Sequence, residues 1–367
     1  MKNEDIKLLD IGLEDYELKK FDANKIKYKK QISKILAESR QKAKLDTCYF
    51  CGKATSSICK SHFVPAFCLR NIAVNGEVNY SNTLINVPGI DFDKGVNEAG
   101  TFRLICRDCD SKIFSDYENP ENYVNEPSPK MIAQIAMKNY LKMISKRLFE
   151  IVLHDDIGGM LPISSGLLNQ QKLVDKLDLD EYQKGFEKAK RLSSKTWSGE
   201  YYIFYYEKLD YVVPIAFQGA IVLISDLKGE IINDIYNLSP DYHTKEVHIC
   251  VFPLQDSSII MMFIDANDKR YKSFYKQFRK LKFDDKLALT NYIIFLYSED
   301  VFFSKKIPQE VITDKRLIAV TRRSQIAVSS KPFGNAIEKV KQNFDLTRWQ
   351  DIPNLLINAY AIDTKNN

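Results

Sequence analysis

Four cysteines in two pairs have the residue types and the spacing of a metal site. Cys48 and Cys51 are separated by two residues, and Cys106 and Cys109 repeat that spacing further along the chain. Two such pairs supply four thiolates, which is the donor set of a tetrahedral Zn²⁺ site with Zn–S distances of about 2.3 Å. The spacing therefore predicts a structural zinc ion held by these four side chains.

The alternatives to zinc are a redox site and a set of buried thiols. Free cysteine behaves as a small hydrophobic residue, and we expect this of Cys59, Cys68 and Cys250. Thioredoxin-like chemistry needs one C-x-x-C beside a βαβ pattern, so two matched pairs fit it poorly. A disulfide framework is disfavoured because the sequence shows no signal peptide and the cysteines are not spread along it.

The composition is that of an ordinary globular chain. The 367 residues are 45% hydrophobic and 28% charged, and this length allows two domains, or one large domain and a small module. The most apolar stretch, 211–224, is interrupted by Pro214 and Gly219, so it is too short and too broken to span a bilayer. We find no secretory or lipidation signal, and we therefore expect a cytoplasmic protein with no membrane partner.

The net charge of +5 is mild, but the basic residues are clustered. Residues 25–44 form one cluster and residues 269–283 form the other. If the second cluster is helical, three-and-four spacing gives one apolar stripe and one basic face. The stripe is Tyr271, Phe274, Phe278 and Leu281, and the basic face is Lys269, Lys272, Lys276 and Lys280. Such a face is either a solvated surface over a core-facing helix or a surface that contacts nucleic-acid phosphates.

The pattern along the chain predicts three parts. Residues 1–45 form a lysine-rich leader with a helix over about 24–44, and residues 46–120 form a zinc module. Residues 121–367 form a larger α+β domain, rich in helices to about residue 200 and in antiparallel strands after it. The predicted helices of this domain cover about 137–152, 181–192, 269–283 and 286–297. The predicted strands are 201–207, 211–217, 220–225, 247–253, 258–265 and 301–304.

Three segments of the zinc module resemble the zinc-containing branch of the HNH endonuclease (ββα-metal, treble-clef) superfamily. They are Cys48-Tyr49-Phe50-Cys51-Gly52, Ser61-His62-Phe63-Val64-Pro65 and Cys106-Arg107-Asp108-Cys109-Asp110. The resemblance covers 46 to about 118, and it extends to uncharacterised bacterial proteins that share this arrangement with an aromatic-Glu pair such as Tyr117-Glu118. It implies a treble-clef module in which the cysteines hold structural zinc and His62 is the general base.

The resemblance also implies a function. It implies a metal-dependent nuclease that cleaves nucleic acid, with DNA expected, and that serves as an effector in bacterial defence or a mobile element, with a protein activator as a possible partner. Ser61 and Phe114 stand where the family has metal ligands, so a catalytic Mg²⁺ or Mn²⁺ must be held by other residues, and Asp110 and Glu118 are the candidates beside His62. The alternative is a catalytically inactive zinc module that binds nucleic acid or a protein, with the C-terminal domain as a sensor or scaffold.

Overall fold

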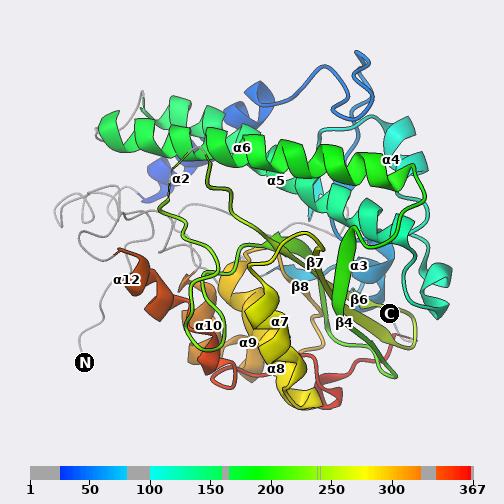
Figure 1. Ribbon diagram of the computed structural model, residues 1–367. Helices are drawn as coiled ribbons and strands as arrows, with labels where there is room; N and C mark the ends of the chain where they lie inside the picture. The colour runs from blue at the N-terminus through cyan, green and yellow to red at the C-terminus, as the bar shows by residue number, and fades with distance from the viewer. Residues whose placement is uncertain are drawn as a thin grey trace.

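The chain folds into three layers, with an antiparallel sheet between two layers of helices (Figure 1). The computed structural model describes residues 25–80, 100–158, 165–237, 239, 241–323 and 336–364. Helices α5 (Pro129–Gly158) and α6 (Ser165–Ser193) run side by side over one face of the sheet. Helices α7 (Lys272–Arg279) and α8 (Phe283–Tyr297) cover the other face. The predicted α+β class is confirmed.

The main sheet has six strands in the order β2-β8-β5-β6-β7-β4, and every neighbouring pair is antiparallel. Its strands are β2 (Asn79–Tyr80), β4 (Tyr201–Leu209), β5 (Ile215–Ile221), β6 (Val247–Pro253), β7 (Ser258–Asp265) and β8 (Phe302–Phe303). Side chains alternate between the faces, so Cys250 and Phe252 enter one core and Ile249 and Val251 enter the other. Because both faces are covered, β6 is buried along its whole length.

The predicted strands 247–253 and 258–265 are confirmed with their bounds, but the two strands predicted at 211–217 and 220–225 are wrong. A single strand, β5, runs through Gln218 and Gly219. The sequence predicts a turn at Gly219, but the structure shows that the absence of a side chain there leaves room for a neighbouring ring. A Cβ at this position would lie 3.0 Å from the ring of Phe217. Glycine inside a strand commonly marks such a close approach.

The helices begin and end where local chemistry favours it. The hydroxyl of Ser128 accepts a hydrogen bond from the backbone N–H of Met131 at 3.3 Å, and Pro129 occupies the first turn of α5. Both α5 and α6 are longer than predicted. The predicted leader helix is confirmed as α2 (Lys25–Lys42). The other helices within the described residues are α3 (Ala66–Ile72), α4 (Arg107–Ile113), α9 (Gln309–Ile312), α10 (Lys315–Thr321), α12 (Ala336–Asn343) and the short 3₁₀ helices η2 (Pro120–Val124), η3 (Leu346–Arg348) and η4 (Asn358–Tyr360).

The segment predicted as the zinc module, residues 46–120, is packed against the sheet in its described parts. Buried residues of the module, including Ile58 and Leu69, belong to one hydrophobic core with Phe252 and Met261 of the sheet. Strand β2 also pairs with β8 in the main sheet. The module therefore shares its core with the domain that follows it in sequence.

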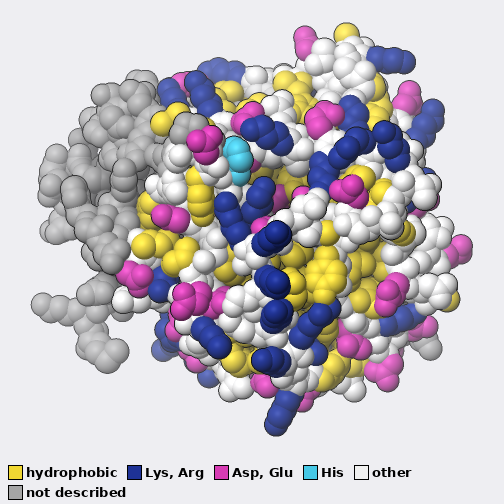
Figure 2. Space-filling model, viewed as in Figure 1, with side chains coloured by type: hydrophobic (Ala, Val, Ile, Leu, Met, Phe, Trp, Pro, Cys, Tyr) yellow, Lys and Arg dark blue, Asp and Glu magenta, His cyan; other side chains and the backbone are white. Residues whose placement is uncertain are grey.

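Helix α7 presents two different faces. Tyr271, Phe274 and Phe278 of the predicted stripe are fully buried, and Leu281, its fourth member, is half-buried. The opposite face is exposed, and Figure 2 shows Lys and Arg side chains gathered over it.

In the described residues, none of the helices has the length and apolar character needed to cross a membrane. Helix α5 is long enough, but it carries several lysine, arginine and acidic side chains.

Candidate metal centre and the adjoining polar cluster

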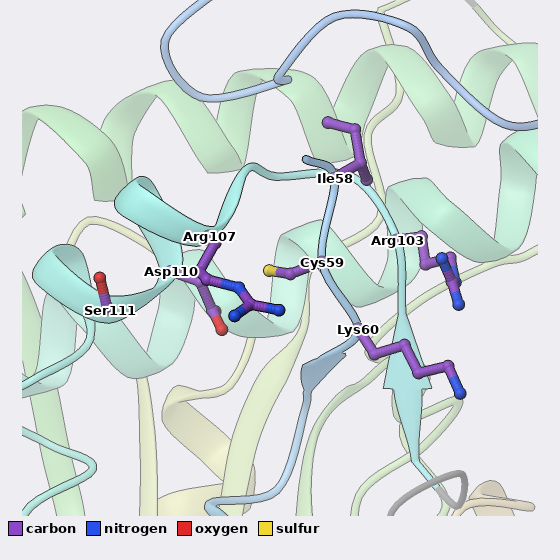
Figure 3. Close-up of a pocket in the computed structure, with 7 residues that line it drawn as sticks. All are labelled: Ile58, Cys59, Lys60, Arg103, Arg107, Asp110 and Ser111. Atoms are coloured by element: carbon purple, nitrogen blue, oxygen red, sulfur yellow. The ribbon is translucent and has the colours of Figure 1, made fainter. Parts of the chain in front are cut away.

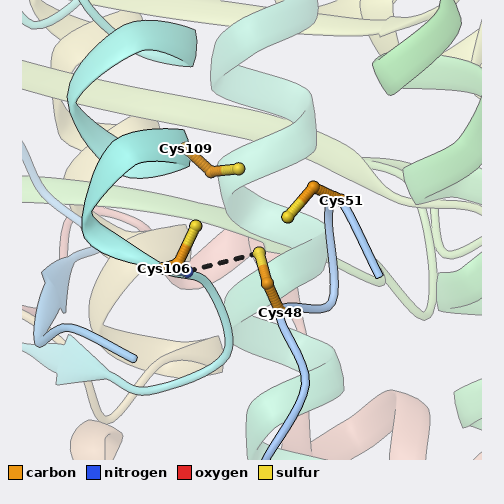
Figure 4. A group of neighbouring side chains, drawn as sticks. All are labelled: Cys48, Cys51, Cys106 and Cys109. Atoms are coloured by element: carbon orange, nitrogen blue, oxygen red, sulfur yellow. Dashed lines mark hydrogen bonds between the residues drawn. The ribbon is translucent and has the colours of Figure 1, made fainter. Parts of the chain in front are cut away.

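The four paired cysteines converge on one point (Figure 4). Their sulfur atoms all lie within 4.8 Å of one another. Four sulfurs at about 2.3 Å from a tetrahedral Zn²⁺ would be separated by about 3.8 Å, so small side-chain adjustments would bring all of them to a zinc ion. The cysteines are positioned to bind a metal ion, and their donor set fits zinc.

Two short backbone segments bring the cysteines together. The first pair sits on a tight turn, where the N–H of Gly52 donates to the carbonyl of Cys48 at 2.8 Å and Gly52 adopts a φ of 69°. This left-handed conformation is readily accessible to glycine. The second pair lies at the start of α4, and the backbone N–H of Cys106 donates to the sulfur of Cys48 at 3.3 Å. Such N–H donors support a thiolate beside a metal ion.

The electrostatics of the cluster favour a bound cation. Burial alone would raise the pKa of Cys48, but hydrogen bonds from the backbone of Cys51, Cys106 and Phe50 lower it to about 7. Burial and the three neighbouring sulfurs raise the pKa of Cys109. Four thiolates cannot be charged at such short range without a cation, and a metal ion removes this conflict.

Helix α6 holds the first cysteine pair in place. The ammonium group of Lys190 donates to the backbone carbonyl of Phe50 at 2.8 Å and lies 4.7 Å from the centre of the Phe50 ring. The ring of Tyr49 packs edge-on against Phe186, with 5.3 Å between the ring centres. The metal centre is thus attached to the long helices as well as to the sheet.

The predicted base, His62, lies on a small two-stranded ladder. Strand β1 (Ser61–His62) pairs antiparallel with β3 (Thr101–Phe102), and His62 stands opposite Thr101. Helix α3 and strand β2 lie between β1 and β3 in the chain, and helix α4 follows β3 after a short connection. His62 itself is half-buried.

The other two predicted catalytic residues, Asp110 and Glu118, are brought together by a lysine. Lys138 of α5 places its ammonium nitrogen 2.9 Å from Asp110 Oδ1 and 3.0 Å from Glu118 Oε1. The same nitrogen donates to Ser61 Oγ at 2.7 Å, and Ser61 Oγ donates to Asp110 Oδ1 at 2.5 Å. The Lys138 side chain is 0% exposed. We call Ser61, Asp110, Glu118 and Lys138 the polar cluster.

Sequence reasoning missed Lys138. Its partners come from β1, α4 and the segment after α4, so only the fold brings them to it. The sequence did hold a signal, because Lys138 is the one charged residue in the mainly apolar run Met131–Leu141. The structure buries this run throughout. A charged residue in such a run needs a partner of opposite charge. Burial raises the pKa of Glu118, and the attraction of Lys138 opposes this shift.

A cavity of about 490 Å³ opens beside the polar cluster (Figure 3). Its wall includes Asp110 and the side chains of three exposed basic residues, Lys60, Arg103 and Arg107. Cys59 also lines it, and burial together with the charge of Asp110 raises the pKa of this thiol to about 11. Cys59 is therefore protonated near neutral pH and is a poor ligand or nucleophile.

The predicted nucleic-acid-binding lysines are exposed on and around α7. Lys272 and Lys276 lie within the helix, and Lys269 and Lys280 flank it. Arg279 of the same helix lies over two tyrosine rings, 5.3 Å from the centre of Tyr202 and 5.7 Å from that of Tyr275. These lysines share one side of the helix, away from the core.

Comparison with known proteins gives no match for this chain among family models, curated proteins or solved structures.

Proposed function

We propose that this protein binds nucleic acid through its zinc module, with a backbone phosphate seated in the cavity beside Asp110. The supporting observation is that Lys60, Arg103 and Arg107 line one cavity together with Asp110. Arginine and lysine side chains at one site are the usual ligands of a phosphate group. Zn²⁺ on the four cysteines would hold β1, β3 and α4 in the arrangement that builds this cavity.

The basic face of α7 supports a polymer rather than a small phosphate compound. A nucleic acid presents one phosphate after another, so it can use basic surfaces that are separate in the protein. Two half-buried tyrosines beside Arg279, Tyr202 and Tyr275, add aromatic rings of the kind on which unpaired bases stack. We propose DNA as the ligand, as expected from the sequence.

The state of the acidic residues favours binding without metal-dependent hydrolysis. A catalytic Mg²⁺ needs free oxygen ligands. Asp110 and Glu118 already share the buried ammonium of Lys138, so their charges are in part compensated. A Mg²⁺ or Mn²⁺ ion could use them only after Lys138 had moved away.

A second candidate is an HNH-type nuclease, and the placement of His62 favours it. Strands β1 and β3 pair with each other and α4 follows β3, which is in keeping with the ββα unit that the resemblance implies, although α3 and β2 lie between the two strands in the chain. His62 follows Ser61, which bonds to Asp110. His62 would take a proton from the attacking water, and the basic residues of the cavity would stabilise charge on the phosphate. A role in bacterial defence, released by a protein activator, belongs to this candidate.

One set of samples tests both candidates. Binding to DNA and RNA of equal length would be measured across a salt series, and cleavage would be followed on the same substrates with and without Mg²⁺ or Mn²⁺. We expect the wild type to bind with a steep salt dependence and Arg103→Ala/Arg107→Ala to bind several-fold more weakly. His62→Ala should bind as the wild type does. Lys195→Ala/Lys315→Ala, which removes two exposed lysines elsewhere, is the matched control.

Each outcome is decisive. Equal binding by the wild type and the arginine double variant would contradict the phosphate site. Cleavage that disappears in His62→Ala, while zinc content and binding are kept, would establish the nuclease.

A further inference from the structure

The Lys138 ammonium group sits at the centre of three oxygen ligands. Ser61 Oγ, Asp110 Oδ1 and Glu118 Oε1 lie 2.7, 2.9 and 3.0 Å from its nitrogen. An ammonium group has three protons, so all of its donors are used. One hydroxyl and two carboxylates are also the kind of oxygen ligands that Mg²⁺ and Mn²⁺ prefer.

We propose that the Lys138 ammonium group is a built-in cation that takes the place of a divalent metal ion in the polar cluster, so that Asp110 and Glu118 bind no Mg²⁺ or Mn²⁺ in the native protein. This proposal goes beyond the proposed function, and it holds or fails whether or not the protein binds nucleic acid.

The surroundings of Lys138 keep it in this position. Its nitrogen lies 3.8 Å from the centre of the Phe114 ring and 5.9 Å from that of Phe102, so aromatic faces close the side away from the oxygens. Attraction between a cation and a ring face adds to the three hydrogen bonds. With no exposed surface, the side chain has no route by which it could exchange these partners for water.

The helix that carries Lys138 is fixed on both sides of it. One turn earlier, Gln134 accepts from the backbone N–H of Tyr117 at 3.1 Å and donates to Asp116 Oδ2 at 2.7 Å. The next residue, Asn139, bonds to His248 of the sheet at 3.0 Å. The segment that bears Glu118 and the turn that bears Lys138 therefore cannot separate without breaking buried hydrogen bonds.

A divalent ion added to this cluster would meet the ammonium at short range. An ion bound to Asp110 and Glu118 would lie within a few ångströms of the Lys138 nitrogen, which is itself fully buried. Repulsion between like charges is strong in buried surroundings. Binding of the ion thus requires removal of the lysine charge.

Titration with Mn²⁺ of the zinc-loaded full chain tests the proposal. Free Mn²⁺ would be followed by its electron paramagnetic resonance signal in wild type, Lys138→Ala, Lys138→Ala/Asp110→Asn and Asp110→Asn. We expect one Mn²⁺ site in Lys138→Ala that is lost in the double variant. We expect no Mn²⁺ site in wild type and no change on Asp110→Asn alone. Lys195→Ala removes an exposed lysine elsewhere on the surface and should match the wild type.

Zinc content and circular dichroism would establish that each variant is folded. If Lys138→Ala does not fold, Lys138→Met, which keeps most of the side-chain volume, is titrated in its place. The comparison of wild type with Asp110→Asn requires no Lys138 variant. A wild-type Mn²⁺ site that Asp110→Asn abolishes would overturn the proposal. A folded Lys138 variant with no Mn²⁺ site would overturn it as well.

Discussion

The charge state of each functional side chain depends on neighbours that are distant in sequence. The thiol of Cys48 has its pKa lowered by N–H groups from its own turn and from Cys106. Burial raises the pKa of Glu118, and the attraction of Lys138, which comes from a helix further along the chain, opposes this shift. A substitution at one of these residues is therefore informative only when it removes one partner of an interaction and leaves the surrounding residues in place.

Cys106→Ser should abolish metal binding, whereas Cys59→Ser should not. Cys106 belongs to the group of four converging sulfurs, and Cys59 lies outside it although both residues belong to the same module. Because the binding free energy of a structural zinc ion is also folding free energy, Cys106→Ser should lower the melting temperature as well. Elemental analysis of purified protein measures the zinc content. Equal zinc in both variants would show that the four cysteines are not the ligands.

The cysteine ligands could be predicted from the sequence because each pair is local. Two residues between cysteines suffice to aim both thiols at one ion, whatever surrounds them. The contacts of Lys138 with Ser61, Asp110 and Glu118 could not be predicted, because these three residues lie 20 to 77 positions away from it along the chain. The spacing of residues in a sequence indicates which side chains a local backbone segment can bring together. It does not indicate which distant helix will pack beside the site.

At the scale of elements, α5 and α6 are held together by close packing. Gly185 of α6 lies against the ring of Tyr140 of α5, and a Cβ at position 185 would come within 2.3 Å of that ring. The hydroxyl of Tyr140 donates to the half-buried carboxylate of Glu246, the residue before β6, so the ring is held in place. The close packing of α5 against α6 at this point therefore requires a residue without a side chain at position 185.

Gly185→Ala should destabilise the protein although alanine is the better helix former. Alanine in a helix gains about 1 kcal/mol over glycine, but overpacking costs about 1–3 kcal/mol, and a ring held at 2.3 Å puts the cost at the upper end. We expect a net loss of about 1–2 kcal/mol in the free energy of unfolding, measured with urea. Lys184→Ala, at the neighbouring exposed position, should change it little. A more stable Gly185→Ala protein would contradict this packing.

Lys272→Glu/Lys276→Glu should weaken nucleic-acid binding without unfolding α7, because both side chains point away from Phe274 and Phe278. Loss of two phosphate contacts would reduce the slope of log K against log salt by about 2. Filter binding at several salt concentrations measures this slope. Lys195→Glu/Lys315→Glu makes the same change of charge elsewhere on the surface. An equal effect of the two pairs would assign the loss to net charge and not to this face.

The elements themselves were predictable where one pattern was unambiguous. The apolar runs 247–253 and 258–265 lie between turn residues, and both strands have the predicted bounds. The prediction of two strands in place of β5 was wrong because a glycine such as Gly219 can indicate either a turn or a close packing contact. The choice between them depends on the ring of Phe217 and on the strand alongside, neither of which a local pattern contains.

At the scale of the whole molecule, buried polar groups connect the layers. His248 of β6 is buried, bonds to Asn139 of α5 and stacks on Phe263 with 4.6 Å between ring centres. Burial lowers the pKa of His248 to about 3, and the weaker effect of Asp265 opposes this shift. The neutral imidazole is therefore part of the contact between α5 and the sheet.

Acid should weaken the fold through His248. The unfolded histidine has a pKa of about 6.5, so the unfolded state binds the proton more readily and stability is lost as the pH falls from about 6.5 towards 3. The loss at pH 5 relative to pH 8 should be about 2 kcal/mol from this residue. Urea unfolding of wild type and His248→Asn at both pH values measures it as the difference between their pH dependences. Phe263→Leu, which removes the stacking ring but no titrating group, should lower stability equally at both pH values. Identical pH dependences in wild type and His248→Asn would contradict the prediction.

The two hydrophobic cores share the strands of one sheet, so they should unfold together. Trp197 packs against the core that contains the zinc module, and Trp349 packs against the core under α7 and α8. Neighbouring residues of β6 enter both cores, which means that neither core can melt while the other keeps its sheet intact. Fluorescence of Trp197→Phe reports the second core, and fluorescence of Trp349→Phe reports the first. We expect coincident melting curves, and removal of zinc by a chelator should lower both midpoints by the same amount, because a ligand of the native state stabilises the whole cooperative unit. A chelator that shifts only the Trp197 signal would show that the zinc module unfolds independently of the sheet.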